Sequence, residues 1–294
     1  MKRQSYSMSM KQSWRSRESM KSNQNDLNTI EVFDHINGLK CAVDHTNAKQ
    51  IWSFTRGAGI KIATIDTGID QSHPDLSYKN GIDMINRTNL IQDEDGHGTH
   101  VAGIIAGKRT GIAPEAELYI AKVLNSDRSG TVTNVMDGIT FALNHQVDIL
   151  CLSLGTNKQL PQILEERIVE AYNKGMIIVS AAGNFGNKIV FNPARMNEVI
   201  GVGGLLEDGS RATYSNYGRG VDVYAPSHKI VSTHLNGKYA SMTGTSMASP
   251  IIAGQIALLL AYFREKGVKI NNNDIYNIIR SCGGALDIRK IIKP

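Results

Sequence analysis

Cysteine is scarce in this chain of 294 residues. Its three cysteines, Cys41, Cys151 and Cys282, cannot all pair within one chain. A sparse and odd set of cysteines suits a reducing compartment better than an oxidising one. We therefore expect the protein to be cytoplasmic.

Long hydrophobic runs are also missing. The longest apolar stretch, residues 256–263, is too short to cross a bilayer. Residues 1–26 carry basic side chains, as the start of a signal peptide would, but polar residues interrupt them throughout and no hydrophobic segment follows. The sequence thus favours neither a transmembrane segment nor secretion by the usual route.

The chain has no basic motif interleaved with aromatic residues, so nucleic-acid binding gains little support. The net charge of +5 would attract acidic peptides, although the same excess could serve solubility alone. With 41% hydrophobic and 20% charged residues, the composition is that of an ordinary globular protein with one sizeable core.

The N-terminal segment differs in composition from the rest of the chain. Residues 1–28 are rich in Ser, Lys, Gln and Asn and cannot bury enough apolar surface to offset the cost of ordering. We expect residues 1–36 to form a polar, flexible tail or a short pro-segment, and residues 37–294 to form one domain. No internal repeat interrupts that domain.

Apolar runs alternate with helical patterns from about Val32 onward. This predicts an α/β fold with a doubly wound, mostly parallel sheet and helices on both faces. The expected strands are residues 60–65, 118–123, 148–154, 176–181 and 199–203, and the expected helices are residues 99–106, 132–144, 160–173 and 247–263. Open sheets of this kind bind ligands at the carboxyl ends of their strands, so we expect the functional groups there.

Three segments place a reactive side chain among glycines and small residues. In IATIDTGID, Asp66 ends an apolar strand; in DGHGTHVAG, His97 stands at the expected start of a helix; in TGTSMASP, Ser246 opens the long apolar helix. The first N–H groups of that helix would face a developing oxyanion beside the serine. Each segment alone is weak evidence, because such residues often only cap turns or helices.

Together, and in the order Asp66, His97, Ser246, these segments resemble the subtilisin-like serine proteases, the subtilases of peptidase family S8. The resemblance covers about residues 37–279 and extends to LSLGT at residues 152–156 and SAAGN at residues 180–184. It implies that residues 37–294 are the catalytic domain of a serine endopeptidase. Ser246 would be the nucleophile, His97 the base, Asp66 its orienting carboxylate and Asn184 the oxyanion-hole amide, with no cofactor or metal in the chemistry.

Family members bind an extended peptide between two exposed backbone edges, in a manner similar to strand addition. The resemblance places these edges at residues 128–130 and 153–155, that is, at Arg128, Ser129, Gly130, Ser153, Leu154 and Gly155. It also places Phe191 and Asn192 near the base of the pocket for the residue before the cut. A bulky ring would make that pocket shallow and would favour small or polar side chains.

The sequence departs from the family pattern at two places. The segment IIAGKRT, with Lys108 and Arg109, runs straight on where many subtilases carry a calcium-binding loop, and its cations are unsuited to Ca²⁺. We therefore predict that the usual high-affinity calcium site is absent; weaker ion sites stay open. The short polar N-terminus leaves no room for the large prodomain of secreted relatives, and is either a removable inhibitory peptide or a tail without a regulatory role.

The resemblance implies that the substrate is a peptide or a precursor peptide, and the positive charge favours an acidic one. A small, basic subtilase without a signal peptide resembles the cytoplasmic leader peptidases that process lantibiotic precursors; a general intracellular subtilisin is the alternative. A catalytically inactive peptide-binding module is a third possibility. An esterase of the α/β-hydrolase type is disfavoured because its G-x-S-x-G motif does not surround Ser246.

Overall fold

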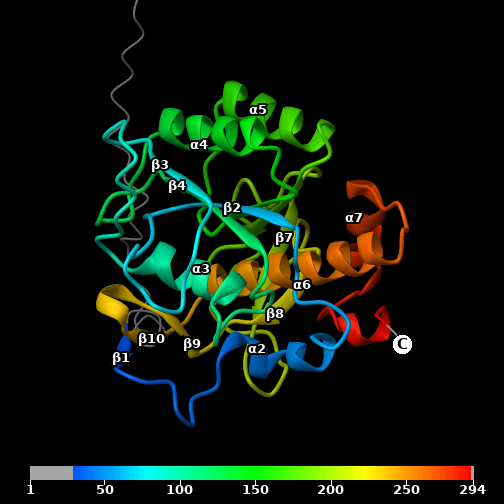
Figure 1. Ribbon diagram of the computed structural model, residues 1–294. Helices are drawn as coiled ribbons and strands as arrows, with labels where there is room; N and C mark the ends of the chain where they lie inside the picture. Colours follow the sequence, from blue (N-terminus) through cyan, green and yellow to red (C-terminus); the bar gives the residue numbers. More distant parts are fainter. Residues whose placement is uncertain (1–28, 293–294) are drawn as a thin grey trace, which may run out of the picture.

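The computed structural model describes residues 29–292 and has a parallel β-sheet between two layers of helices (Figure 1). This confirms the α/β fold class. The sheet has the strand order β3 (Asn80–Asp83), β4 (Glu117–Lys122), β2 (Lys61–Asp66), β5 (Ile149–Leu152), β6 (Ile177–Ala181), β7 (Ile200–Leu205), β8 (Val223–Pro226). All neighbouring pairs are parallel, so the carboxyl ends of the strands share one edge.

The strands are apolar without interruption because both of their faces are covered. Along β2, Ile62 packs among residues of the two helices on one face of the sheet, whereas Ala63 and Ile65 pack among residues of the two helices on the other. Ile62 pairs with Leu118 of β4 and with Ile149 of β5, which places β2 inside the sheet. The resulting core is continuous on both sides of the sheet.

Four helices form the two layers. α4 (Val132–Asn144) and α5 (Gln162–Asn173) cover one face, and α3 (His97–Ala106) and α6 (Thr245–Glu265) cover the other (Figure 1). α4 begins after Thr131, whose hydroxyl accepts the Asn134 N–H at 3.1 Å and so caps the helix. Each of these helices contains most of a segment expected to be helical.

Helix α6 is by length and composition apolar enough to cross a membrane. However, 83% of its most apolar window is buried inside the protein, against β5, β6, β7 and α3. A core helix of a globular protein has this property, so the helix is weak evidence for a membrane span. In the part of the chain that the structure describes, it is the one such helix.

Several short helices and strands were not predicted from the sequence. A small antiparallel sheet has the order β1 (Glu31–Phe33), β10 (Tyr239–Met242), β9 (Ile230–Thr233). The expected tail over residues 1–36 therefore ends too late, because β1 pairs with β10; residues 1–28 lie outside the described part. The other unexpected elements are β3, β8, α2 (Ala42–His45), α7 (Asn272–Ser281) and the 3-10 helices η1 (Ala48–Ile51), η2 (Leu235–Gly237) and η3 (Ile288–Lys290).

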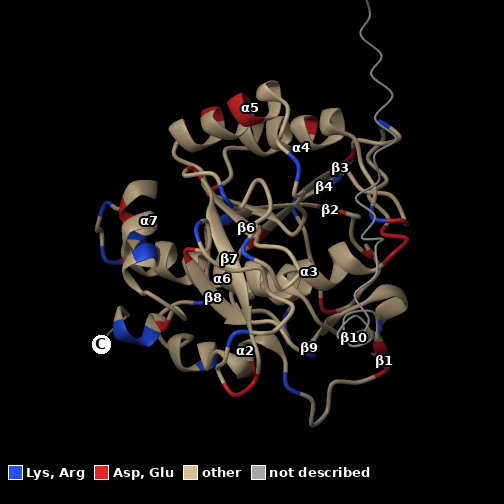
Figure 2. Ribbon diagram, turned by 180° about the vertical axis from the view of Figure 1, so that it is seen from behind, with Lys and Arg blue, Asp and Glu red and all other residues tan. Residues whose placement is uncertain are grey.

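The charged side chains are spread over several elements. Figure 2 shows acidic residues on α5 and basic residues around α7 and the C-terminal end. Residues 29–292 hold as many acidic as basic residues, so the excess of positive charge lies in residues 1–28 and 293–294 of the sequence. All three cysteines are free, with Cys41 and Cys151 buried and Cys282 exposed.

Candidate active site

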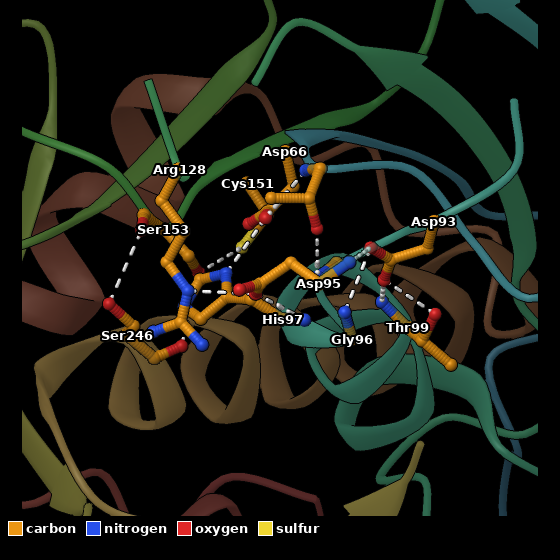
Figure 3. A network of polar contacts seen from close by, with 12 residues as sticks. Asp66, Asp93, Asp95, Gly96, His97, Thr99, Arg128, Cys151, Ser153 and Ser246 are labelled. Carbon is orange, nitrogen blue, oxygen red and sulfur yellow. Dashed lines mark hydrogen bonds and ion pairs between the residues drawn. The ribbon is translucent and has the colours of Figure 1, made fainter. Parts of the chain in front are cut away.

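Asp66 is the last residue of β2 and is only 1% exposed. Its Oδ1 accepts the backbone N–H of Thr67 at 2.7 Å and lies 2.7 Å from Nδ1 of His97 (Figure 3). The following Gly68 has a φ of 117°, which side chains rarely adopt, and a Cβ there would lie 2.5 Å from the Ile91 carbonyl oxygen. The strand end and this turn fix the carboxylate against the imidazole.

His97 is the first residue of α3, and two aspartates accept hydrogen bonds from the backbone around it. Asp95 Oδ1 accepts the His97 backbone N–H at 3.0 Å. Asp93 accepts the N–H groups of Asp95 and Gly96 and both the N–H and the hydroxyl of Thr99. Burial disfavours the charge of Asp93, but these hydrogen bonds outweigh it and hold its pKa below the ordinary value.

Ser246 is the second residue of α6 and is tied to the end of β5. Its Oγ donates to the carbonyl of Ser153 at 3.2 Å, and Ser153 Oγ lies 3.1 Å from the carbonyl of Ser246. The Ser246 carbonyl has no intrahelical donor, because Pro250, four residues further along α6, has no N–H. Ser246 and His97 line one cavity of about 680 Å³, and the serine hydroxyl is turned to Ser153. Catalytic hydrogen bonds often form only when substrate is bound.

Asn184 follows β6 and faces the same cavity. Its Oδ1 accepts both the N–H and the hydroxyl of Thr245, at 2.8 and 2.9 Å, which leaves the amide nitrogen as its donor group. Gly244 has a φ of 148°, and a Cβ there would lie 3.1 Å from that nitrogen. As the second residue of a helix, Ser246 has an N–H without an intrahelical acceptor. The two donors converge from α6 and the end of β6.

Both expected peptide-binding edges contribute to the cavity. Ser153, Leu154 and Gly155 of one edge and Arg128 and Gly130 of the other are among its lining residues. Ser129 is not among the lining residues; its N–H is bonded to the Asn125 side chain in the turn. Of the residues expected in the triad, the oxyanion hole and the two edges, all line the cavity except Ser129 and Asp66, and Asp66 contacts His97. Of the two residues expected at the base of the pocket, Phe191 lines the cavity and Asn192 does not.

Arg128 has a contact that the sequence did not indicate. Its Nε lies 2.7 Å from Asp95 Oδ1, the same oxygen that accepts the His97 N–H (Figure 3). The Arg128 side chain is 44% exposed, and that of Asp95 is 15% exposed. This ion pair joins one peptide-binding edge to the start of the helix that carries His97.

Beyond Leu154 the cavity continues as an apolar chamber between α4 and α5. Its walls include Val135 and Ile139 of α4 and Leu164 and Ile168 of α5. This chamber was not predictable from the sequence, because apolar residues at helical spacing are indistinguishable from ordinary core residues. Phe185, beside Asn184, is a second lining residue that sequence reasoning missed.

The segment expected to lack calcium ligands contacts a buried carboxylate. Asp75 is 4% exposed, and its oxygens lie 3.3 Å from Nε and from the backbone nitrogen of Arg109. Arg109 also contacts the Tyr239 hydroxyl, and Lys108 Nζ donates to the Pro74 carbonyl at 2.8 Å. Among residues 29–292 there is no group of three or more His, Cys, Asp or Glu suited to a metal ion.

The chain is similar in sequence and in fold to known proteins. Residues 57–281 match the model of the subtilase family, peptidase S8. Subtilisin BL of Lederbergia lenta is 37% identical over 235 residues, which cover 78% of this chain and 85% of that protein. The major intracellular serine protease of Bacillus subtilis strain 168 is 36% identical over 285 residues, covering 90% of this chain and 88% of the relative.

Two further similarities agree with these. The intracellular serine protease of Paenibacillus polymyxa is 38% identical over 250 residues, covering 78% of this chain and 75% of that protein. The crystal structure of a cold adapted subtilisin-like serine proteinase superimposes with a TM-score of 0.71 at 30% identity, covering 77% of this chain and 83% of the other. Sequence and fold thus lead to one family.

Proposed function

This chain belongs to the subtilase family of serine endopeptidases, and on that premise we propose that Asp66, His97 and Ser246 are its catalytic triad. Ser246 Oγ attacks the scissile carbonyl, and His97 takes the hydroxyl proton and returns it to the leaving amine. Asp66 holds Nδ1 of His97 and stabilises the imidazolium. Water then attacks the acyl-enzyme: His97 takes a proton from the water and returns it to Ser246 Oγ, which leaves as the acid product is released.

Negative charge develops on the carbonyl oxygen only in the tetrahedral state. The Asn184 amide nitrogen and the Ser246 N–H are the donors that we assign to it. Thr245 holds the oxygen end of the Asn184 amide, so the donor is oriented before the reaction begins. Such preorganised donors lower the barrier because they bind the transition state more strongly than the substrate.

The observation that carries this proposal is the buried 2.7 Å contact between Asp66 and His97, in a cavity that Ser246 and Asn184 also line. The test is stoichiometric labelling by a sulfonyl fluoride, mapped by mass spectrometry, together with peptide cleavage. Wild type should be labelled at Ser246 and should cleave, and Ser246→Ala should lose about a millionfold in turnover. Ser281→Ala, on α7, is the matched control. A peptide-binding module would bind equally well with and without the Ser246 hydroxyl and would not be labelled.

For the substrate, we propose a dedicated processing step on an acidic precursor peptide, such as a lantibiotic leader, in the cytoplasm. Arg128, which lines the cavity and keeps a side chain 44% exposed beside its partner Asp95, supports an acidic substrate. The chain's net charge of +5 comes from residues 1–28 and 293–294 and adds only a long-range attraction. The names of two relatives, both called intracellular serine proteases, support the location. General turnover of intracellular proteins is the second candidate, favoured by those same names.

Cleavage mapping on paired acidic and neutral peptide libraries separates the two roles. A processing enzyme should cut few sites, prefer acidic peptides at low salt and lose that preference as salt screens the charges. Many cuts with no dependence on charge would instead establish general turnover. We also propose that the peptidase needs no calcium, because Arg109 supplies a positive charge at Asp75.

A further inference from the structure

Two stretches of chain form the walls of a slot beside Ser246. One is residues 153–155 after β5, and the other is residues 181–184, which begin at the last residue of β6. Both walls carry a glycine on the cavity, Gly155 and Gly183, so neither presents a side chain at that point. Because no side chain projects from either glycine, the slot has space for a side chain that enters from the cavity.

A third segment, residues 191–192, forms the base of this slot. Phe191 donates its N–H to the carbonyl of Ala182 in one wall at 3.0 Å. Asn192 exchanges two backbone hydrogen bonds, of 2.7 and 2.8 Å, with Thr156 beyond the other wall. The Asn192 amide also donates to the Lys158 carbonyl at 2.8 Å. Residues 191–192 are therefore fixed to both walls.

The side chain of Phe191 stands in the space between the glycines. A Cβ on Gly183 would lie 2.9 Å from Cγ of Phe191, and a Cβ on Gly155 would lie 3.2 Å from its Cβ. The Phe185 ring, 46% exposed, lies 5.5 Å from the Phe191 ring and continues this apolar surface to the rim. The room that the two glycines leave is thus already taken by an aromatic ring of the protein.

We infer that Phe191 sets cleavage specificity by exclusion, so that the enzyme cuts after Gly, Ala or Ser and rejects large side chains. This rests on the proposed function: with the scissile carbonyl between Ser246 Oγ and the Asn184 amide, the preceding side chain must point between the two walls. A methyl or hydroxymethyl group fits above the ring. A leucine or phenylalanine would have to displace Phe191, which is bonded through its backbone to Ala182 and packed between glycines.

The test uses two peptides that differ only in the residue before the cut, Ala or Phe. The ratio of kcat/KM for Phe over Ala is measured for wild type, Phe191→Ala and Phe191→Gly. Wild type should prefer Ala by about tenfold or more, and the variants should raise the ratio in the order Gly above Ala above wild type, by about tenfold or more for Gly. Phe263→Ala, which removes a ring near the other end of α6 and outside the cavity lining, should leave the ratio unchanged.

Retained cleavage of the Ala peptide shows that a variant is folded, and Phe191→Leu is a milder substitute that keeps an apolar residue in the slot. Equal cleavage of both peptides by wild type would overturn the inference, as would a ratio that does not rise with Phe191→Gly or that rises as much with Phe263→Ala. All of these outcomes require an active enzyme. A wild type that cuts neither peptide and is not labelled at Ser246 would instead refute the proposed function.

Discussion

Replacing Arg109 with alanine tests whether a protein cation stabilises the site where many relatives place calcium. The Asp75 side chain is 4% exposed and that of Arg109 is 51% exposed, with Nε and Oδ1 3.3 Å apart. Removing one partner of a fully buried pair costs about 3–5 kcal/mol, whereas an exposed pair is worth about 0–1 kcal/mol. Because solvent screens one partner only, we expect about 1.5–2.5 kcal/mol, including the lost contact with the Tyr239 ring.

The assay is thermal unfolding with the active site inhibited to prevent self-digestion. A change of 1 kcal/mol shifts the Tm of a domain of about 150–250 residues by about 2–4 °C, so Arg109→Ala should lose about 3–10 °C. Arg289→Ala is the matched control: its Nε lies closer to Asp287, at 2.8 Å, but the carboxylate is 29% exposed. That variant should lose about 1 kcal/mol or less.

A calcium chelator supplies the second arm. The wild-type Tm should not change on chelation. In Arg109→Ala the Asp75 carboxylate lacks its guanidinium partner, and added cations that take the place of the guanidinium should restore part of the lost stability. The reasoning is refuted if chelation lowers the wild-type Tm by several degrees, or if Arg109→Ala and Arg289→Ala are equally stable.

Three further predictions follow from the site and its surroundings. Asn184→Ala should lower kcat by about 100–1000-fold with little change in KM, because the amide binds charge that exists only in the transition state; a selective rise in KM would contradict this. Arg128→Ala should abolish any preference for acidic peptides, and Arg128→Lys should retain part of it, as measured by kcat/KM at low and high salt. Burial lowers the pKa of His100 from 6.5 to about 3, so the folded protein keeps this ring neutral while the unfolded chain protonates it. The stability from this group is complete above pH 6.5 and is lost as the pH falls, by about 2 kcal/mol between pH 7 and pH 5, and a His100→Gln variant should show a flatter denaturation profile over that range.

The sequence predicted the central strands and the catalytic candidates because each leaves a local signal. Uninterrupted apolar runs predicted β2, β4, β5, β6 and β7, whose two faces are both buried. The glycines around Asp66, His97 and Ser246 also lie within a few residues of the side chain they position. Short motifs and strands of this kind are the features that sequence patterns reveal best.

The remaining features depend on contacts between distant residues. Arg128 and Asp95 are 33 residues apart, and neither neighbourhood predicts the pair. Strands of three or four residues, such as β1 and β9, are too short to show a period. Helix α7 is polar on average, and its capping box between Asn271 and Asp274 is the signal that could have located it.

Ser246 lies in the first turn of α6, whose residues are buried almost continuously from Met247 to Ala261. The nucleophile therefore belongs to the element that opens last, since local opening is confined to regions with little buried surface. Heat inactivation and global unfolding should coincide in this enzyme. The backbone of this core will be a poor substrate for neighbouring molecules, because it becomes accessible only in molecules that have already lost the ability to cut.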